Sequence, residues 1–251
     1  MNGVWWWQGA AAAALGLALL ALALLAVAPL GWRLGWWHFR FAFSVPMAGA
    51  GLVGAAAAVL ALATLAAGWA GLDARGLAMA LAAAGLGAVL AYVPWSYNRL
   101  RTALPRIHDI TTDTAAPPPL AAVLPAREAE AAASAVYEGA ELARLQNAAY
   151  PDIAPLEAPL SAERAFEAAL ATARAMPGWR IVAADAASGR IEGSQRSRWF
   201  AFTDDFVIRV APAGAGARID MRSISRQGRS DFGVNAARIR AFMGALRRRL
   251  G

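Results

Sequence analysis

The run from Arg222 to Ile239, R-S-I-S-R-Q-G-R-S-D-F-G-V-N-A-A-R-I, holds the side chains best suited to bind an anion. In an extended strand, Arg222, Ile224 and Arg226 would share one face. The chain then passes two glycines and enters a predicted helix. Guanidinium groups and the N–H groups at a helix N-terminus both bind carboxylate or phosphate. The sequence therefore offers a candidate anion site of six residues: Arg222, Arg226, Arg229, Ser230, Asp231 and Asn235.

The same run also has a structural interpretation. Ser230, Asp231 and Asn235 are residue types that cap helices and form turns. Because nothing in the run specifies what a ligand would be, the sequence leaves both interpretations open.

The adjacent carboxylates Asp204 and Asp205 are a second candidate. Two carboxylates can act as general acid and base or bind a metal ion. Neighbours on a strand point to opposite faces, however, so these two would converge only at a turn or a bulge. The favoured interpretation is that one of them forms an ion pair across the sheet, with Arg209, Arg222 or Arg226.

His108 and Asp109 could form a pair that activates a nucleophile, but the chain has no cysteine and no serine in the sharp turn typical of hydrolases. The pair opens the stretch I-H-D-I-T-T-D-T-A-A-P-P-P-L, in which three consecutive prolines favour extended backbone. We expect an extended arm over residues 107–124 that docks on a partner through His108, Asp109, Thr111, Thr112 and Asp113. With two histidines and no cysteine in the chain, we expect no metal site and no cofactor.

Three long uncharged stretches precede this arm: Met1 to Trp32, Phe41 to Leu72 and Gly76 to Asn98. A helix of about 20 apolar residues can cross a bilayer core. Tryptophans near the ends of the stretches suit the headgroup level. We predict a three-span region over residues 1–106, with spans at about 9–30, 46–69 and 77–97. The first stretch lacks the positive start and short core of a cleaved signal peptide, so we expect it to stay as a span.

The composition agrees with a membrane protein. Apolar residues make up 59% of the chain, compared with roughly 45–50% in soluble domains, and charged residues 16%, compared with roughly 25%. These values argue against a chain that is soluble and globular throughout, and they exclude a chain that is disordered throughout. Charges within the spans would have suggested a transporter, and the three stretches hold none.

Residues 125–251 are predicted to form an α+β domain, an antiparallel sheet flanked by helices. We expect a helix over Pro125–Tyr150, a loop over Pro151–Leu160, a helix capped by Ser161 and a last helix at about Asn235–Leu250. From Trp179 the apolar period changes to two. Five strands are expected there: Arg180–Ala184, Arg190–Arg196, Trp199–Thr203, Phe206–Ala211 and Arg218–Arg226.

The net charge of +7 is distributed unevenly, with +5 over residues 1–106, −6 over residues 107–189 and +8 over residues 190–251. No helix-turn-helix or zinc-finger signature accompanies the basic balance, so no nucleic-acid partner is expected. Five arginines flank the spans on the side of the C-terminal domain, and one lies on the other side. By the positive-inside rule, this count places the C-terminal domain in the cytoplasm.

The runs S-R-W-F-A-F-T-D-D-F-V-I-R-V and R-S-I-S-R-Q-G-R-S-D-F-G-V-N-A-A-R-I-R resemble the family called domain of unknown function 1499. The stretches I-H-D-I-T-T-D-T-A-A-P-P-P and Y-P-D-I-A-P-L resemble its bacterial, membrane-anchored branch, and the similarity covers roughly residues 107–250. Carried over by position, the typical residues of the family are Asp109, Thr111, Thr112, Asp113, Tyr150, Pro151, Asp152, Asp204, Asp205, Arg222, Ser223, Ser225, Arg226, Gly228, Ser230, Asp231, Gly233, Asn235 and Arg238.

The resemblance implies no activity, since the family is defined by its lack of one. Other members are lipoprotein-like or lie in the thylakoid lumen, which implies an extracytoplasmic domain. We therefore expect a multi-pass protein of the bacterial inner membrane with a periplasmic C-terminal domain, although the arginine count opposes that side.

Two functions follow as expectations. The first is a non-enzymatic membrane protein whose α+β domain docks on a partner protein, or serves as an accessory or assembly subunit of a membrane complex. The alternative is the binding or turnover of a small anionic ligand by the segment from Arg222 to Asn235. The expected partners are the lipid bilayer and a protein or membrane complex.

Overall fold

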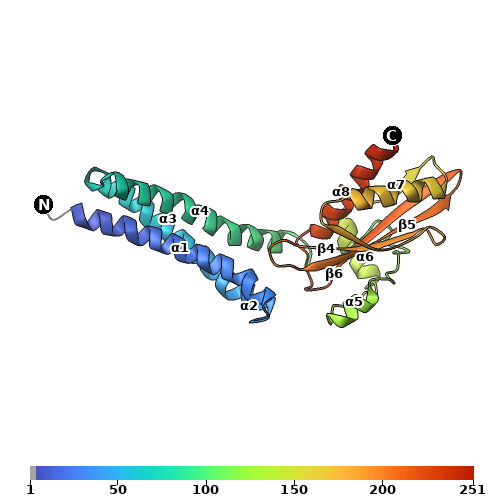
Figure 1. Cartoon of the computed structure of the whole chain (residues 1–251), viewed down its shortest axis with the longest axis horizontal. Helices are drawn as coiled ribbons and strands as arrows, with labels where there is room; N and C mark the ends of the chain where they lie inside the picture. The colour runs from blue at the N-terminus through green and yellow to red at the C-terminus, as the bar shows by residue number, and fades with distance from the viewer. Residues whose placement is uncertain (1–3) are drawn as a thin grey trace. The chain divides into compact units, whose positions relative to one another are not determined.

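The computed structural model describes residues 4–251, and the chain divides into two compact units, Met1–Leu100 and Arg101–Gly251 (Figure 1). The predicted fold class is confirmed: three long apolar helices precede a domain in which helices flank a six-stranded antiparallel sheet. The first three residues of the expected membrane region, residues 1–3, lie outside the described part of the chain.

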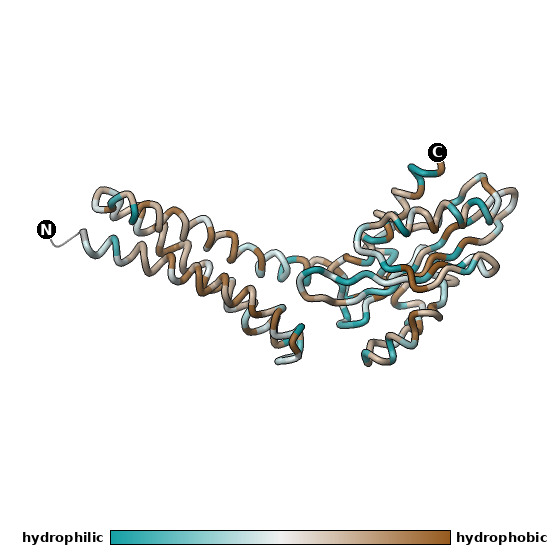
Figure 2. The backbone as a smooth tube through the Cα atoms, viewed as in Figure 1, coloured by the Kyte–Doolittle hydropathy of each residue, from teal (hydrophilic) through white to brown (hydrophobic). Residues whose placement is uncertain are grey.

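The N-terminal unit is built from α1 (Val4–Arg33), α2 (Phe39–Ala42), the π-helical turn η1 (Phe43–Met47), α3 (Ala48–Gly68), the 3₁₀ turn η2 (Trp69–Gly71) and α4 (Ala74–Ala103). Three helical stretches are long and apolar enough to cross a membrane: Trp5–Arg33, Phe39–Gly71 and Ala74–Ala103. Figure 2 shows hydrophobic residues along most of their length. Each of these stretches continues past its expected span, because the helical backbone extends beyond the most apolar residues that hydropathy marks.

Small side chains let these helices approach closely. Ala14, Ala18, Ala57, Ala61 and Ala83 are fully buried together in one cluster. A Cβ atom added at Gly87 would lie 2.7 Å from the carbonyl oxygen of Gly54. The crossing of α3 and α4 therefore requires glycine at this point.

The C-terminal unit contains β1 (Asp109–Thr111), α5 (Leu124–Ala129), α6 (Ala140–Ala149), β2 (Leu156–Ala158), α7 (Ala162–Ala175), β3 (Trp179–Asp185), β4 (Arg190–Arg196), β5 (Thr203–Ala213), β6 (Gly216–Ser225) and α8 (Val234–Leu250). The strand order is β1-β6-β5-β4-β3, and β2 pairs with β6 next to β1. All pairs are antiparallel.

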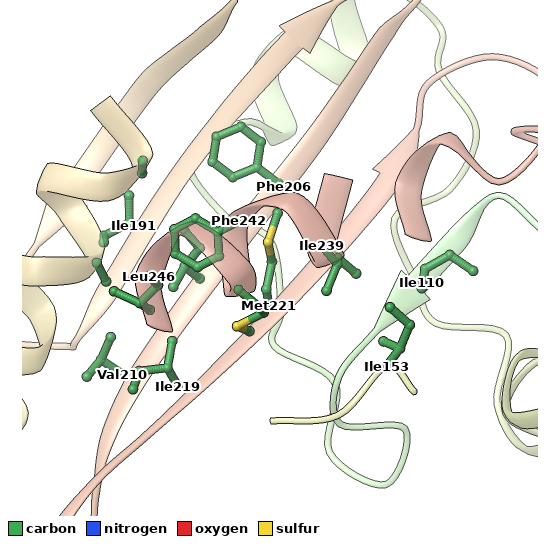
Figure 3. Close-up of a cluster of buried hydrophobic side chains, with 14 of the residues drawn as sticks. Ile110, Ile153, Ile191, Phe206, Val210, Ile219, Met221, Ile239, Phe242 and Leu246 are labelled. Carbon is green, nitrogen blue, oxygen red and sulfur yellow. The ribbon is translucent and has the colours of Figure 1, made fainter. Parts of the chain in front are cut away.

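Each face of the sheet is covered differently. Helices α7 and α8 lie over one face (Figure 1), where Phe206, Met221 and Phe242 are fully buried in the main core (Figure 3). On the other face, Val207 and Ile224 pack with Leu120 and Val123, which belong to the segment leading into α5. We call these the helix side and the loop side of the sheet.

The two ends of the sheet also differ. At one end the chain arrives at His108, β4 ends, β5 begins at Thr203 and β6 ends at Ser225. We call this the entry end. At the other, the hairpin end, Ala213 pairs with Gly216 across the turn between β5 and β6.

Three local expectations differ from the structure. The helix expected over Pro125–Tyr150 is split into α5 and α6, because the carbonyls of Ala133 and Ala135 accept hydrogen bonds from Arg127 and Arg222 instead of continuing a helix. The strand expected at Trp199–Thr203 is a loop up to Phe202, closed by hydrogen bonds between Ser197 and Phe202, and Thr203 begins β5. The extended arm and the loop expected at Pro151–Leu160 contribute the strands β1 and β2, each of three residues.

Candidate functional site

The polar residues proposed from the sequence gather in two clusters on opposite faces of β5 and β6. Asp204 and Asp205 belong to different clusters, because neighbours on a strand point to opposite faces. Asp204 pairs with Arg238 of α8 on the helix side, whereas Asp205 pairs with Arg127 of α5 on the loop side. The two carboxylates therefore do not converge into an acid and base pair.

The helix-side cluster is centred on Arg238. Its guanidinium donates to Asp204 at 2.6 Å, to Gln195 at 2.8 Å and to the Ser223 hydroxyl at 2.9 Å. It also donates to the side-chain oxygen of Asn235. Every nitrogen of this guanidinium thus has a partner within the domain.

Asn235 connects this cluster to the start of β1. Its oxygen accepts from Ser223 at 2.7 Å, and its amide nitrogen donates to the Ser225 hydroxyl at 3.0 Å and to the His108 carbonyl at 2.9 Å. Asn235 is fully buried. Its role in the structure is to hold β6, α8 and the entry of the chain together.

The loop-side cluster is centred on Asp205, which is fully buried. Arg226 binds it with two hydrogen bonds of 2.9 and 2.7 Å, and Arg127 donates to it at 2.7 Å. Arg226 also pairs with Glu130 at 2.7 Å. The hydrogen bonds to Asp205 raise the pKa of the Arg226 guanidinium above its ordinary value.

Arg222 forms a second buried pair on the loop side. It binds Asp109 of β1 with two hydrogen bonds, of 2.9 and 2.7 Å, and donates to the Ala135 carbonyl at 2.7 Å. Its guanidinium also lies over the ring of Tyr137, 5.5 Å from the centroid. Burial, together with the charge of Asp109, raises the pKa of Tyr137 to about 12.

A third group of charges lies further along β6, where Asp220 binds Arg209 at 2.9 Å and Arg218 at 3.0 Å. Both arginines also pair with Asp113, at 2.9 and 3.1 Å. The Thr112 hydroxyl donates to Asp220 at 3.1 Å.

The remaining residues of the candidate anion site surround the start of α8. Asp231 accepts hydrogen bonds from the N–H groups of Gly233 at 3.0 Å and Asn235 at 2.7 Å. Burial, to which the nearby charge of Asp204 adds, raises the pKa of Asp231 above its ordinary value despite these bonds. Ser230 is half-buried and Arg229 is exposed. The helix N-terminus is therefore occupied by a side chain of the protein itself.

The residues expected in a docking arm are mostly inside the fold. His108, Asp109, Thr111 and Thr112 are buried, and Asp113 is half-buried in its ion pairs. Strand β1 pairs with β6 on one side. On its other side, the Gln146 amide accepts from the Thr111 N–H at 2.9 Å and donates to its carbonyl at 2.7 Å. Residues 109–111 therefore form an edge strand instead of part of an extended arm, and the Gln146 side chain makes hydrogen bonds to the backbone on its outer side.

The sequence alone assigns no partner to Arg127, Gln146 or Arg238, although each makes a buried contact in these clusters or at β1. Arg127 has a usable signal, since it is the single arginine between residues 107 and 143, a range that holds no lysine. Gln146 gives no local signal, because its partner Thr111 is distant in the chain. Arg238 is one of the typical residues of the family, but its pairing with Asp204 lies across the helix-to-sheet contact and has no local signal.

The buried ion pairs on the two faces of the sheet have the geometry of structural ion pairs. Within residues 4–251 there is no group of three or more carboxylate or imidazole side chains placed to hold a metal ion. A shallow hollow of about 560 Å³ lies at the hairpin end, lined by residues that include Glu157 and Pro159. It is therefore separated from both clusters by most of the length of β5.

Comparisons with known proteins found a family match for the C-terminal unit. A family model described as "Protein of unknown function (DUF1499)" matches residues 109–246, from β1 into α8. The match covers more than half of the chain and stops short of the three long apolar helices. No curated protein and no solved structure matches the chain.

Proposed function

Because this chain belongs to the DUF1499 family, whose members have no assigned activity, we propose a role from its own structure: a non-enzymatic, multi-pass protein of the bacterial inner membrane. In this proposal the α+β domain docks on a partner protein as an accessory or assembly subunit of a membrane complex. The chain would belong to the membrane-anchored branch of the family.

The observation that carries the proposal is the state of the charged side chains on β5 and β6. Asp204, Asp205, Arg222 and Arg226 are each buried and each engaged in an ion pair within the domain. A catalytic or ligand-binding site needs polar groups that converge on an accessible space. These groups instead converge on one another, which supports a structural role.

The anion-binding alternative has less support from the same geometry. A ligand at the start of α8 would have to displace Asp231 from the N–H groups of Gly233 and Asn235. A ligand at Arg222 would compete with the two hydrogen bonds from Asp109. Of the six candidate residues, Arg229 alone is exposed.

The docking proposal can be tested by purifying the full chain, tagged after Gly251, from its own membranes in a mild detergent. We expect a particle whose mass exceeds that of the 26.2 kDa chain by a partner in fixed stoichiometry. A matched Asp205→Asn variant, whose domain is destabilised, should lose this partner at temperatures at which its domain unfolds and the original domain does not. A particle holding this chain alone would overturn the proposal.

We propose further that the domain lies on the periplasmic side, following the location of other members of the family. The arginine count opposes this side, with five arginines against one. Fusing alkaline phosphatase or a fluorescent protein after Gly251 tests the two locations. Phosphatase activity without fluorescence is expected, and fluorescence without phosphatase activity would place the domain in the cytoplasm.

A further inference from the structure

We propose that the entry end of the α+β domain is a membrane-contact surface that binds the anionic headgroups of phospholipids. The occupant is the surface of the same bilayer that holds the three helices, so this inference rests on the proposed membrane insertion. It adds a binding surface to a domain whose buried charges are already paired.

Three separate segments meet at the entry end. The N–H of Asp231 donates to the Ile107 carbonyl at 3.2 Å, which joins the loop before α8 to the segment that follows α4. The N–H of Arg226 donates to the Thr203 carbonyl at 3.0 Å, which joins the same loop to the one between β4 and β5. Residues 104–108, 197–202 and 226–233 therefore lie next to one another at the entry end, and their exposed side chains form the proposed surface.

This surface carries exposed arginines without carboxylate partners. Arg106, Arg198 and Arg229, one from each segment, are exposed, and within residues 4–251 none of them forms an ion pair. Arg196 is also exposed and donates to the backbone carbonyl of Ala201 at 3.2 Å.

Three acidic residues of the same end face inward, whereas a fourth, Glu130, is exposed and is paired with Arg226 at 2.7 Å. Asp204 is paired with Arg238, and Asp205 is paired with Arg127 and Arg226. Asp231 is buried against N–H groups. The charge presented outward is thus positive, which is complementary to anionic lipid headgroups.

The loop between β4 and β5 adds aromatic side chains to this surface. Trp199 and Phe202 are partly exposed, and Phe200 contacts both, with ring centroids 5.4 and 5.2 Å away. Tryptophan beside arginine is the combination of residues that suits the headgroup level of a bilayer.

The chain itself keeps this end near the membrane. Helix α4 ends at Ala103 and β1 begins at Asp109. Even a fully extended connection of this length spans only roughly 20 Å. If α4 crosses the bilayer, the entry end is held within that distance of the helix terminus, where attraction to headgroups acts over about one Debye length of 8–10 Å.

The absence of cysteine from the chain allows a site-specific test in the full-length protein. A bimane fluorophore is attached to Ser230→Cys at the entry end or, as the control, to Ala215→Cys at the hairpin end. The protein is placed in nanodiscs of phosphatidylcholine, with or without phosphatidylglycerol, that contain a lipid bearing a nitroxide quencher on its headgroup. The quencher acts only at short range, so quenching reports contact rather than tethering.

We expect at least twofold stronger quenching at position 230 when phosphatidylglycerol is present, and weak quenching at position 215 with either lipid. Replacing two arginines, Arg198→Gln with Arg229→Gln, should remove most of that increase, as should 0.5 M salt. The matched pair Arg164→Gln with Arg249→Gln removes the same charge from exposed residues without ion pairs in the described chain, and should leave quenching unchanged.

Quenching at position 230 that is equal with both lipids, or unaffected by the Arg198 and Arg229 substitutions, would overturn the proposal. A separate fluorophore on Leu62→Cys, an exposed position within α3, is read with a quencher on the acyl chain. Quenching there without contact at position 230 would reject the surface and keep membrane insertion. No quenching at either position would reject both.

Discussion

At the scale of single residues, Asp205 is the carboxylate whose loss we expect to destabilise the domain strongly. It is fully buried and neutralises two guanidinium groups, those of Arg127 and Arg226. Asp205→Asn would leave Arg127 without an anionic partner and Arg226 with only the exposed Glu130, and removing one partner of a buried ion pair costs about 3–5 kcal/mol. We expect a loss of this size in the free energy of unfolding of the domain. It can be measured by urea unfolding of the full chain in detergent, followed by a fluorophore on Ala215→Cys.

The control for this substitution is Asp152→Asn. Asp152 also binds an arginine with two hydrogen bonds, those from Arg240 at 2.6 and 2.7 Å, but both side chains are exposed. Exposed pairs contribute about 0–1 kcal/mol. Equal losses for the two variants would show that burial of the Asp205 cluster is not what makes it important.

The raised pKa of Asp231 predicts that the free energy of unfolding depends on pH. Burial raises its pKa in the folded domain above the unfolded value of about 3.9, so the native state binds more protons than the unfolded state above about pH 4. The stabilisation linked to this group is complete below that pH and is lost as the pH rises through the native pKa. In Asp231→Asn we therefore expect the free energy of unfolding to fall less between pH 4 and neutral pH than in the original chain.

The measurement is the difference between the two urea unfolding curves at each pH, which cancels the carboxylates that the two proteins share. Those carboxylates include Asp113 and Asp152, whose pKa values are lowered and which act in the opposite direction. A difference that stays constant with pH would contradict the raised pKa of Asp231.

At the scale of the elements, the crossing of α3 and α4 depends on two glycines. A Cβ atom at Gly87 would lie 2.7 Å from the Gly54 carbonyl oxygen and 2.8 Å from the Ala58 nitrogen, and neither backbone atom can move without its helix. We expect Gly87→Ala to separate the helices and lower their thermal stability in detergent, measured by circular dichroism.

The matched control is Gly85→Ala, on the same helix, where an added Cβ meets nothing within 4 Å. Alanine favours a helix over glycine by about 1 kcal/mol, so this variant should be neutral or slightly more stable. If both substitutions stabilised the helices, the close crossing would be disproved.

The elements differ in how far the sequence predicts them. Helix α7, with its Ser161 cap, and strands β3, β4 and β6 lie within a few residues of their expected bounds, because caps and apolar periods are local signals. Strands β1 and β2 were not predicted, since three-residue strands exist only through pairing with the distant β6.

The candidate site was less predictable than the fold, for the same physical reason. The pairing of Asp205 with Arg226 was among the alternatives considered, because both residues lie on adjacent strands. The partners Arg127 and Asp109 come from segments about 80 and 110 residues away from their ion-pair partners, and sequence spacing carries no information at that range. These pairs form only because the segment leading into α5 covers the loop side of the sheet and β1 pairs with β6.

At the scale of the whole molecule, the number of spans determines which parts share a side of the membrane. With three spans, the loop at Leu34 and the α+β domain must face one side, and the turn before α4 must face the other. In single-cysteine variants, we expect a membrane-impermeant maleimide to label Leu34→Cys and Ala215→Cys from the same side of the membrane. Ala74→Cys should be labelled from the opposite side.

Spheroplasts and inverted vesicles expose the two sides in turn, so each variant acts as the control for the others. All three positions are exposed in the structure, so a failure to react reports the membrane barrier rather than burial. If the domain is periplasmic, Leu34→Cys and Ala215→Cys react in spheroplasts and Ala74→Cys reacts in inverted vesicles. Labelling of Leu34→Cys and Ala74→Cys from one side would mean that the stretch Phe39–Gly71 between them does not span, and the three-span arrangement would be wrong.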